Sequence, residues 1–333
     1  MIQLLDRVEA LCMNWLDNAD QFGVLKQAEL RQTIALLLRV SLSKTKSPTV
    51  KDEASWLYDI ILTEDVINEL IGLNLQNTSV RFRSWVGGDK DGHPYVDERS
   101  TMMSWKQSRR RIVQFIQLEL DRLDHLLSLT GHIDLEKLRF QLQDLKRLTI
   151  EMNIIETGDA KKIKVFRQAL EKMQKSHSKT AGEVSPQLKK VGYLFELFPA
   201  LVVPLEFRED SEVVAQAIKD KDLAINGMFN ALRSVAKGGV AKHYVQGFVL
   251  SMVQTSEDIS MGIQLMKKHL KSNSIPVIPL FETRSALKNA VKMVSEIAER
   301  EADYIENVNV QWDGKLEVML GYSDSSKENG VLL

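Results

Sequence analysis

The chain has 333 residues, with 44 basic and 45 acidic side chains and a formal net charge of −1. That length suffices for one large core or two domains, and the near-zero charge gives no support for a nucleic-acid or membrane-surface partner. Cys12 is the single cysteine, which excludes an intramolecular disulfide and a thiolate metal cluster. The N-terminal segment carries Asp6 and Glu9, unlike a signal peptide, and no apolar run approaches the ~18 residues of a membrane helix. We therefore expect a soluble cytoplasmic protein.

Residues 1 to about 75 have the apolar spacing of amphipathic helices. A polar segment with Pro48, Ser41 to Thr49, predicts a loop between the second helix and the third. The expected helices lie around Leu4 to Leu16, from about Leu25 to Leu42 and from about Lys51 to Leu73.

A Gly-Asp-rich turn follows, within Val80 to Val96, and Asp97 is a plausible N-cap for a long helix from about Glu98 to Leu129. For the arginine cluster at 109–111 inside that helix, a solvated face is favoured over a specific anion site. Further helices are expected at about Leu135 to Ile155 and Ala160 to Ser176, before a loop from Ser176 to Pro186.

The second half alternates short apolar runs with helical stretches, which predicts βαβ units whose parallel strands are buried on both faces. The expected strands are Ala200 to Phe207, Gly247 to Val253, Ile275 to Glu282 and Leu316 to Tyr322. The expected helices between them are about Ser211 to Ala236, Ser256 to Leu270 and Ser285 to Ile305.

The predicted fold is a helix-rich α/β protein, a partial (β/α) barrel with a large layer of long helices. We expect residues 1–190 to form the helical layer, including the Gly-Asp turn at 79–96, and residues 191–333 to form the barrel part. The strands end on polar residues, and in a barrel such ends converge on one mouth. Those residues are Arg208, Ser251, Glu282 and Asp324.

Several segments resemble phosphoenolpyruvate carboxylase of the bacterial and plant type, in the same order as in that family. They are SWVGGDKDGHP (Ser84 to Pro94), LEFREDS (Leu205 to Ser211), YVQGFVLSMVQTSED (Tyr244 to Asp258), PLFET (Pro279 to Thr283) and EVMLGYSDSSKENG (Glu317 to Gly330). The family counterparts read SWMGGDRDGNP, LDIRQES, YVISMTRSASD, PLFET and EVMIGYSDS. The resemblance covers roughly Ser79 to the end and, more faintly, the preceding helices.

The resemblance implies a divalent metal site, Mg²⁺ or Mn²⁺, held by Glu282 and Asp324. Two carboxylates from separate strand ends suit these cations, which prefer hard oxygen ligands and keep waters. The resemblance also makes Arg208 the arginine that contacts the substrate phosphate. It places Lys327 near bicarbonate or the transferred phosphoryl group.

Trp85 and Leu280 match pocket-wall residues of the family, and Lys90 is a further candidate for substrate binding. Lys90 stands where the family usually has arginine, and His93 where it has asparagine. A lysine does not reproduce the planar fork of an arginine, so the resemblance is weaker support for a substrate-binding role of Lys90. Around Arg208, the departures are Glu206, Phe207, Glu209 and Asp210.

Plain structural interpretations stay open for three of these residues. Trp85 is alternatively a core residue, Arg208 a surface partner of Glu209 or Asp210, and Lys327 a solvated turn lysine. Asp89 and Asp91 have the spacing that opens a calcium loop, but Pro94 occupies the glycine position of that motif.

The family converts phosphoenolpyruvate and bicarbonate into oxaloacetate and phosphate, through carboxyphosphate and an enolate. The segments TAHPT, with the catalytic histidine, and FHGRGG are not in this sequence. We therefore expect an internal piece of a longer carboxylase, inactive on its own. The full-length family is usually tetrameric, so a homo-oligomer is expected. The alternatives are a non-catalytic helical scaffold or regulatory remnant and, more weakly, another barrel lyase or aldolase.

Overall fold

The computed structural model describes residues 2–17, 23–39, 48–78, 80–129, 135–271, 275–312 and 314–321 of the chain. It divides into two compact units, Met1–Thr49 and Val50–Leu333. The first unit contains helices α1 (Ile2–Asp17) and α2 (Val24–Leu37), which pack together through Leu11 and Leu30. The predicted domain boundary near residue 190 lies inside the second unit and stays a prediction.

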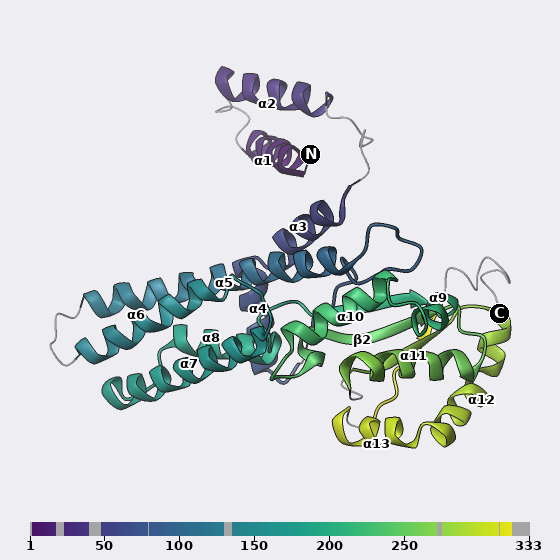
Figure 1. The fold of residues 1–333 in the computed structure, drawn as a ribbon. Coiled ribbons are helices and arrows are strands. Elements are labelled where there is room, and N and C mark those ends of the chain that lie inside the picture. Colours follow the sequence, from purple (N-terminus) through teal and green to yellow (C-terminus); the bar gives the residue numbers. More distant parts are fainter. Residues whose placement is uncertain are drawn as a thin grey trace. The chain divides into compact units, whose positions relative to one another are not determined.

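The second unit combines a bundle of helices with a small sheet (Figure 1). Its helices before the sheet are α3 (Val50–Ile61), α4 (Glu64–Leu75), α5 (Glu98–Ser128), α6 (Glu136–Glu151), α7 (Asp159–Ala181) and α8 (Pro186–Leu197). Its remaining elements are β1 (Leu205–Asp210), α9 (Ser211–Ala217), α10 (Ala224–Val235), the 3₁₀ turn η3 (Ala241–His243), β2 (Val245–Ser251), α11 (Ser256–Leu270), β3 (Val277–Phe281), α12 (Arg284–Arg300), α13 (Ala302–Gln311) and β4 (Met319–Leu320).

Among the described residues the strands form one parallel sheet in the order β1-β2-β3-β4, with helices in every connection. This is the consecutive β/α winding of a barrel, and it covers four of the eight strands that a closed barrel of this type has. The predicted helix-rich α/β fold with a partial barrel is therefore confirmed.

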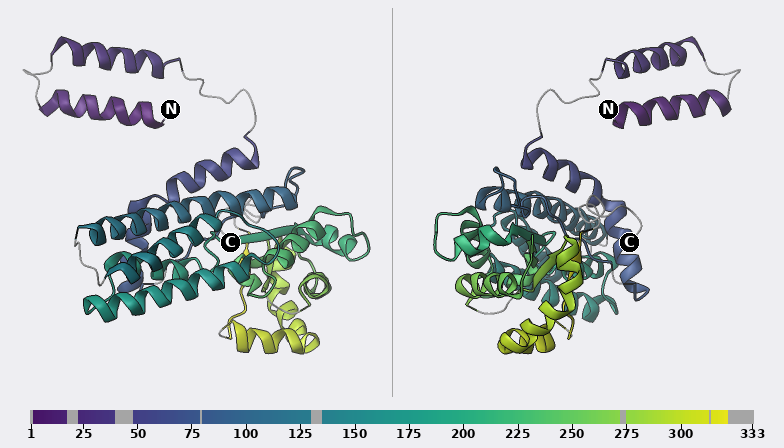
Figure 2. Two further views of the ribbon diagram at one scale, coloured as in Figure 1. Left: turned by 60° about the vertical axis from the view of Figure 1, so that its left-hand side comes forward. Right: turned by 90° about the vertical axis from the view of Figure 1, so that its right-hand side faces the viewer.

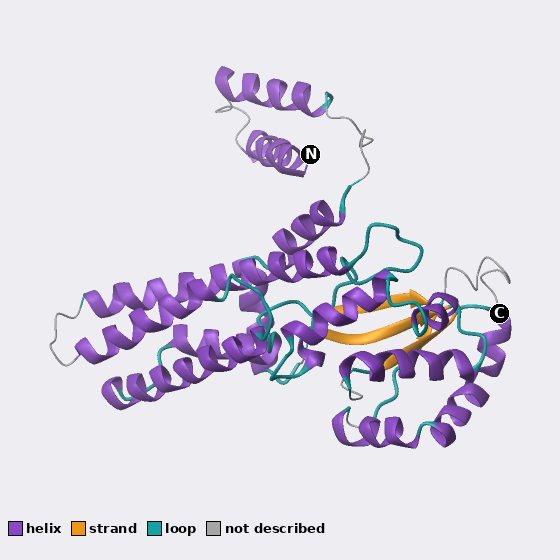
Figure 3. Ribbon diagram, in the orientation of Figure 1, coloured by secondary structure: helices purple, strands orange, loops and turns teal. Residues whose placement is uncertain are grey.

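One face of the sheet is covered by the connecting helices (Figure 3). Phe207 of β1 and Phe248 of β2 both pack edge-on against Phe229 of α10, with ring centroids 5.5 and 5.1 Å away. Since alternate residues of a strand point to opposite faces, the intervening residues form the other, inner face. Val249, Ile278 and Leu280 are buried together there, with Met319 of β4 packed against them.

The long helix α5 joins the helical layer to the sheet. It packs against α6 and α8, and α7 packs against both of these, in the bundle that the left view of Figure 2 shows lengthwise. Helix α5 begins where the sequence predicts, after the N-cap Asp97. The Asp97 side chain accepts from the Ser100 N–H at 2.8 Å, and the Ser100 hydroxyl oxygen accepts from the Asp97 N–H at 2.8 Å. Trp105, near this end, lies in the core beneath the sheet, while Ile116 lies in the core of the helical layer.

Three predicted helices are each broken in two. The stretch from Lys51 to Leu73 divides at Thr63, whose hydroxyl caps α4 by accepting from the Val66 N–H. The stretch from Ser211 to Ala236 divides into α9 and α10 around Asp220, where the Asn226 amide donates to the carbonyl oxygens of Ala217 and Asp220. The stretch from Ser285 to Ile305 divides at Glu301 into α12 and α13.

The interpretation of the arginine cluster as a solvated face is wrong for Arg109, which is completely buried. Its guanidinium pairs with Asp159 at 2.7 Å and also donates to backbone carbonyl oxygens. Arg111 pairs with Asp59 at the surface, and Arg110 is exposed. Within the described part of the chain, every helix is too short or too polar to span a lipid bilayer.

Candidate functional site

The Gly-Asp turn lies along the edge of β1 that does not pair with β2. Backbone hydrogen bonds join Glu206 N–H to Ser84 O and Arg208 N–H to Gly88 O, both at 3.0 Å, and Lys90 N–H to Arg208 O at 2.9 Å. The turn therefore behaves as a short extra strand that is fixed beside Arg208 by the backbone itself.

Two glycines allow the turn to approach this closely. A Cβ at Gly88 would lie 2.2 Å from the backbone oxygen of Glu206, which leaves no space for any side chain. Gly87 has a φ of +85°, in the left-handed region that favours glycine, and a Cβ there would lie 2.8 Å from Ser100 O. The Thr101 hydroxyl of α5 donates to Gly87 O at 2.7 Å and holds the turn from the other side.

Trp85 projects from this turn with half of its surface exposed (52%). Its indole N–H donates to the buried carboxylate of Glu206 at 2.6 Å. Arg83 donates to Glu206 at 2.9 Å and to Glu317, just before β4, at 2.7 Å. The indole is thus anchored by its polar edge and leaves an apolar surface exposed. Arg83 also links β1 to the segment that precedes β4.

Arg208 pairs with acidic residues of the turn rather than with its sequence neighbours. Its Nη2 lies 2.8 Å from Asp91, and its Nε lies 4.0 Å from Asp89. The alternative of a surface pair with Glu209 or Asp210 is therefore not what the structure has. Glu209 points to the opposite face of the strand, and the Asp210 carboxylate accepts from the Glu212 N–H at the start of α9.

The Arg208 fork is only partly satisfied. Its Nε and the facing Asp89 Oδ1 are both buried, and neither makes a hydrogen bond with the described residues. Burial raises the pKa of the Asp89 carboxyl, although the positive charge of Arg208 acts in the opposite direction. Buried polar atoms without partners are uncommon and often mark functional positions.

Lys90 follows Asp89 and is half-buried. Its ammonium donates to the backbone oxygen of His93 at 2.9 Å, and His93 itself is exposed. Its role as a substrate-binding residue stays a prediction.

Glu209 is a buried carboxyl group at the end of β1, only 3% exposed. Burial raises its pKa to about 7, above the ordinary 4.5. Between pH 4.5 and 7 the folded state keeps a proton that the unfolded state releases, so stability is expected to fall by about 2–4 kcal/mol as pH rises through this range. Urea unfolding against pH should show this slope. Glu209→Gln should abolish it, while Glu212→Gln at an exposed neighbouring position should keep it.

The predicted pocket-wall residue Leu280 lies on the inner face of the sheet, 7% exposed, in contact with Val249 and Ile278. Arg208 is in register with Val249, and Val249 with Ile278. Arg208 therefore belongs to the same face as Leu280. The next residue with this orientation is Glu282, directly after β3.

Glu282 is buried (5% exposed), and its carboxylate accepts from the Met252 N–H at 2.7 Å. Met252 directly follows β2 and has a φ of 56°, an uncommon conformation for a non-glycine residue. Gly321, after β4, fits against Glu282, because a Cβ there would lie 2.4 Å from the Glu282 Cβ. The ends of β2, β3 and β4 thus meet around this carboxylate, with β2 between Glu282 and the strand of Arg208.

The second predicted metal ligand, Asp324, and the predicted catalytic Lys327 lie outside the described residues. Within the described ranges, the structure has no group of three or more His, Cys, Asp or Glu side chains placed to hold a metal. A site made of two carboxylates, waters and substrate would not form such a group. The buried Glu282 offers carboxylate oxygens, which are compatible with Mg²⁺ or Mn²⁺, and the metal site stays a prediction.

Sequence reasoning missed the contacts that position these side chains. Glu206 was noted only as a departure from the family motif, although a buried acid in an apolar strand is a signal that it has a partner. Asp91 was considered only as a calcium ligand, although it is the principal partner of Arg208.

Comparison with known proteins gives a consistent result. The family profile described as phosphoenolpyruvate carboxylase matches residues 25–225 and 200–333. The phosphoenolpyruvate carboxylases of Enterobacter sp. (strain 638) and Salmonella typhi are each 26% identical to the chain, over 421 and 423 aligned residues. Each alignment covers 96% of this chain and 45% of the relative, so the chain spans less than half the length of these curated relatives.

The aligned lengths exceed the 333 residues of the chain, so the relatives carry additional residues within the matched region. The profile nevertheless matches nearly the whole chain, from the second helix to the last residue. The chain therefore belongs to the phosphoenolpyruvate carboxylase family.

Proposed function

We propose that the chain binds phosphoenolpyruvate and a divalent metal ion as part of a phosphoenolpyruvate carboxylase, which forms oxaloacetate and phosphate from phosphoenolpyruvate and bicarbonate. The observation that supports this most directly is the backbone pairing of the Gly-Asp turn with β1. That pairing brings Trp85 and Lys90 to the strand that carries Arg208.

In this proposal, Arg208 binds the substrate phosphate. A guanidinium can bind a phosphate through two parallel N–H donors, and the Nη1 of Arg208 makes no hydrogen bond with the described residues. Asp91, on Nη2, holds the fork in place. Trp85 and Leu280 provide an apolar wall that excludes water from the enolate carbon.

Glu282 and Asp324 hold Mg²⁺ or Mn²⁺, and the bound metal supplies positive charge for the developing enolate oxygen. Lys327 acts near bicarbonate or the transferred phosphoryl group. The excess of negative charge near the strand ends agrees with a substrate that binds together with a metal ion. Within residues 89–91 and 208–210, the acidic side chains Asp89, Asp91, Glu209 and Asp210 outnumber the basic ones, Lys90 and Arg208. Next to these carboxylates, a highly charged anion such as phosphoenolpyruvate binds more favourably when a cation binds with it.

We propose further that this polypeptide has no measurable carboxylase turnover by itself, because its sequence does not contain the TAHPT segment with the catalytic histidine. A cytoplasmic location and a homo-oligomeric assembly, tetrameric in the full-length family, belong to the same proposal.

The test is Mn²⁺ binding to the chain, measured by electron paramagnetic resonance. Glu282→Ala and Asp324→Ala should each weaken binding by more than the roughly 10- to 100-fold that loss of a supporting residue costs a metal site. Glu299→Ala, an exposed glutamate of α12, should leave the affinity within about twofold.

If Mn²⁺ affinity does not depend on Glu282 and Asp324, the scaffold alternative gains and the proposed metal site is lost. Arg208→Gln should weaken phosphoenolpyruvate binding without changing Mn²⁺ binding. This variant therefore tests the phosphate site separately from the metal site. Metal-dependent turnover in an oxaloacetate-coupled assay would contradict the expected inactivity of this chain.

A further inference from the structure

A second group of basic residues surrounds a small cavity at the amino end of β2. The cavity has a volume of about 170 Å³ and lies between the first turns of α7 and the loop that connects α10 to β2. Its charged lining residues are Lys164 and Arg167 of α7 and the titratable His243 of η3. No aspartate or glutamate is among the described residues that line it.

The connecting loop contains Gly238 and Gly239 and lies directly on α7. A Cβ at Gly239 would lie 2.6 Å from the Cβ of Ala160, so the loop has no space for a side chain there. Gly238 has a φ of +85°, which favours glycine. The loop therefore forms one wall of the cavity with backbone rather than with side chains.

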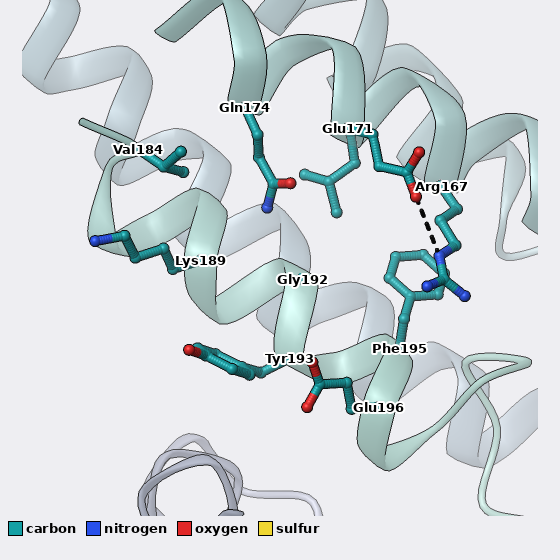
Figure 4. A pocket seen from close by; sticks show the side chains of 10 residues that line it. Arg167, Glu171, Gln174, Val184, Lys189, Gly192, Tyr193, Phe195 and Glu196 are labelled. Carbon is teal, nitrogen blue, oxygen red and sulfur yellow. Dashed lines mark ion pairs between the residues drawn. The ribbon is translucent and has the colours of Figure 1, made fainter. Parts of the chain in front are cut away.

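Of the two cations that line the cavity, one has no partner among the described residues and the other has only part of its guanidinium engaged. Lys164 makes no ion pair or hydrogen bond with the described residues. Arg167 pairs with Glu171 through its Nε alone, at 3.4 Å, as the dashed line indicates in Figure 4, which shows a different pocket between α7 and α8 that Arg167 also lines. The guanidinium carbon lies 5.8 Å from the centroid of the Phe195 ring, and the two terminal nitrogens have no hydrogen bond among the described residues.

Apart from Glu171, which pairs with Arg167, the acidic side chains near the cavity are engaged with other residues. Asp159, at the start of α7, is buried against Arg109, and Glu156 pairs with Lys162 at 2.7 Å. Lys161 and Lys237 add two more positive charges on the same segments, and neither has an ion pair with the described residues. This part of the surface has a local excess of positive charge.

The titration of His243 agrees with this electrostatic picture. The pKa of this half-buried imidazole is lowered, first by burial and then by the positive charges of Arg167 and Lys242. Both cations are therefore close enough to oppose protonation of His243. An anion in the cavity would remove that opposition.

The cavity is too small for a drug-sized ligand, whose pockets measure about 300–1,000 Å³. Its volume corresponds to roughly six water molecules at about 30 Å³ each, which suits one tetrahedral oxyanion with some of its hydration. A guanidinium fork, an ammonium and an imidazole are the usual partners of phosphate oxygens. We propose that Lys164, Arg167 and His243 form a binding site for a phosphate dianion, either free or as a phosphate monoester.

This site is separate from the candidate site at the other end of the sheet. Tyr244 lines the cavity and directly precedes β2, whereas Met252, at the opposite end of β2, contacts Glu282. The strand between them spans about 20 Å. The proposal does not depend on the proposed carboxylase function.

The test is titration of the full chain with inorganic phosphate while the histidine ring signals are followed by NMR, with His243→Gln used for assignment. Phosphate should raise the pKa of His243 by roughly one unit, because a nearby anion favours the imidazolium. Arg167→Gln and Lys164→Gln should each weaken phosphate binding by roughly tenfold. Lys172→Gln, which removes the same charge from an exposed position on the same helix, should change it less than twofold.

Methyl phosphate distinguishes the two sources of the ligand. If it binds as inorganic phosphate does, the site accepts a phosphate group on a larger molecule, and if it does not, the site is for the free ion. The response in Arg208→Gln should equal that of the unmodified chain, so failure of the carboxylase proposal would leave this result intact. A pKa of His243 that phosphate does not change, or affinities unaffected by both α7 substitutions, would overturn the proposal.

Discussion

Replacing Arg109 with methionine is expected to lower the free energy of unfolding by about 3–5 kcal/mol, the usual cost of removing one partner from a buried ion pair. Asp159, completely buried, would keep its charge without a cation. The carbonyl oxygens of Leu201 and Met152 would also lose donors that now lie at 2.9 and 2.8 Å. Urea unfolding at pH 7, followed by circular dichroism, measures the change.

Arg110→Met is the matched control, because this neighbouring arginine is exposed and makes no ion pair with the described residues. It should change stability by less than about 0.5 kcal/mol. Adding Asp159→Asn to Arg109→Met should recover part of the loss, because the uncompensated charge is then removed. If Arg109→Met and Arg110→Met unfold at the same urea concentration, the buried pair contributes nothing that a methionine cannot replace.

This cluster illustrates what the sequence alone could not supply. Three consecutive arginines on a helix point in directions about 100° apart, so they cannot all share one environment. Which of them faces the core depends on Asp159, fifty positions away. A charge run predicts a solvated face on average, and a single buried partner distant in the sequence reverses that for one member.

Elements whose signals are local were predicted well. Asp97 begins α5 as expected, and α11 has the predicted limits of Ser256 and Leu270. Helix α8 was missed, although Ser185 followed by Pro186 is an N-cap and first-turn pair. The apolar residues of α8 merge in the sequence with those before β1, and that continuity conceals the helix.

The residues of the candidate site likewise fall into those that a local sequence signal predicts and those that it does not. Arg208 and Glu282 could be selected because polar residues at the ends of buried strands are conspicuous in the sequence. The carboxylate that fixes Trp85 comes from Glu206, 121 positions later, and the principal partner of Arg208 is Asp91. Such pairs arise only when the turn lies along β1, so no local pattern predicts them.

Substituting Gly88 with alanine is expected to detach the Gly-Asp turn from β1 and to cost about 3 kcal/mol of stability, at the upper end of the range for overpacking. The new methyl group would lie 2.2 Å from Glu206 O, and a backbone atom of a buried strand cannot move aside as a side chain does. The hydrogen bonds that join Gly88 and Lys90 to Arg208 would be lost together. Urea unfolding measures the stability, and the rate of trypsin cleavage after Lys90 reports on the turn itself.

Gly92→Ala is the control in the same turn. It introduces backbone strain without a steric clash, whereas Gly88→Ala introduces a steric clash with β1. Gly92 has a φ of +64°, yet a Cβ there would meet no atom within 4 Å. Its cost should therefore be only the ~1–2 kcal/mol of a left-handed non-glycine residue, with Lys90 still protected from trypsin. Because Trp85 and Arg208 depend on the same backbone pairing, Gly88→Ala should also weaken phosphoenolpyruvate binding far more than Gly92→Ala. Equal behaviour of the two variants would mean that close contact between turn and strand does not hold the candidate site together.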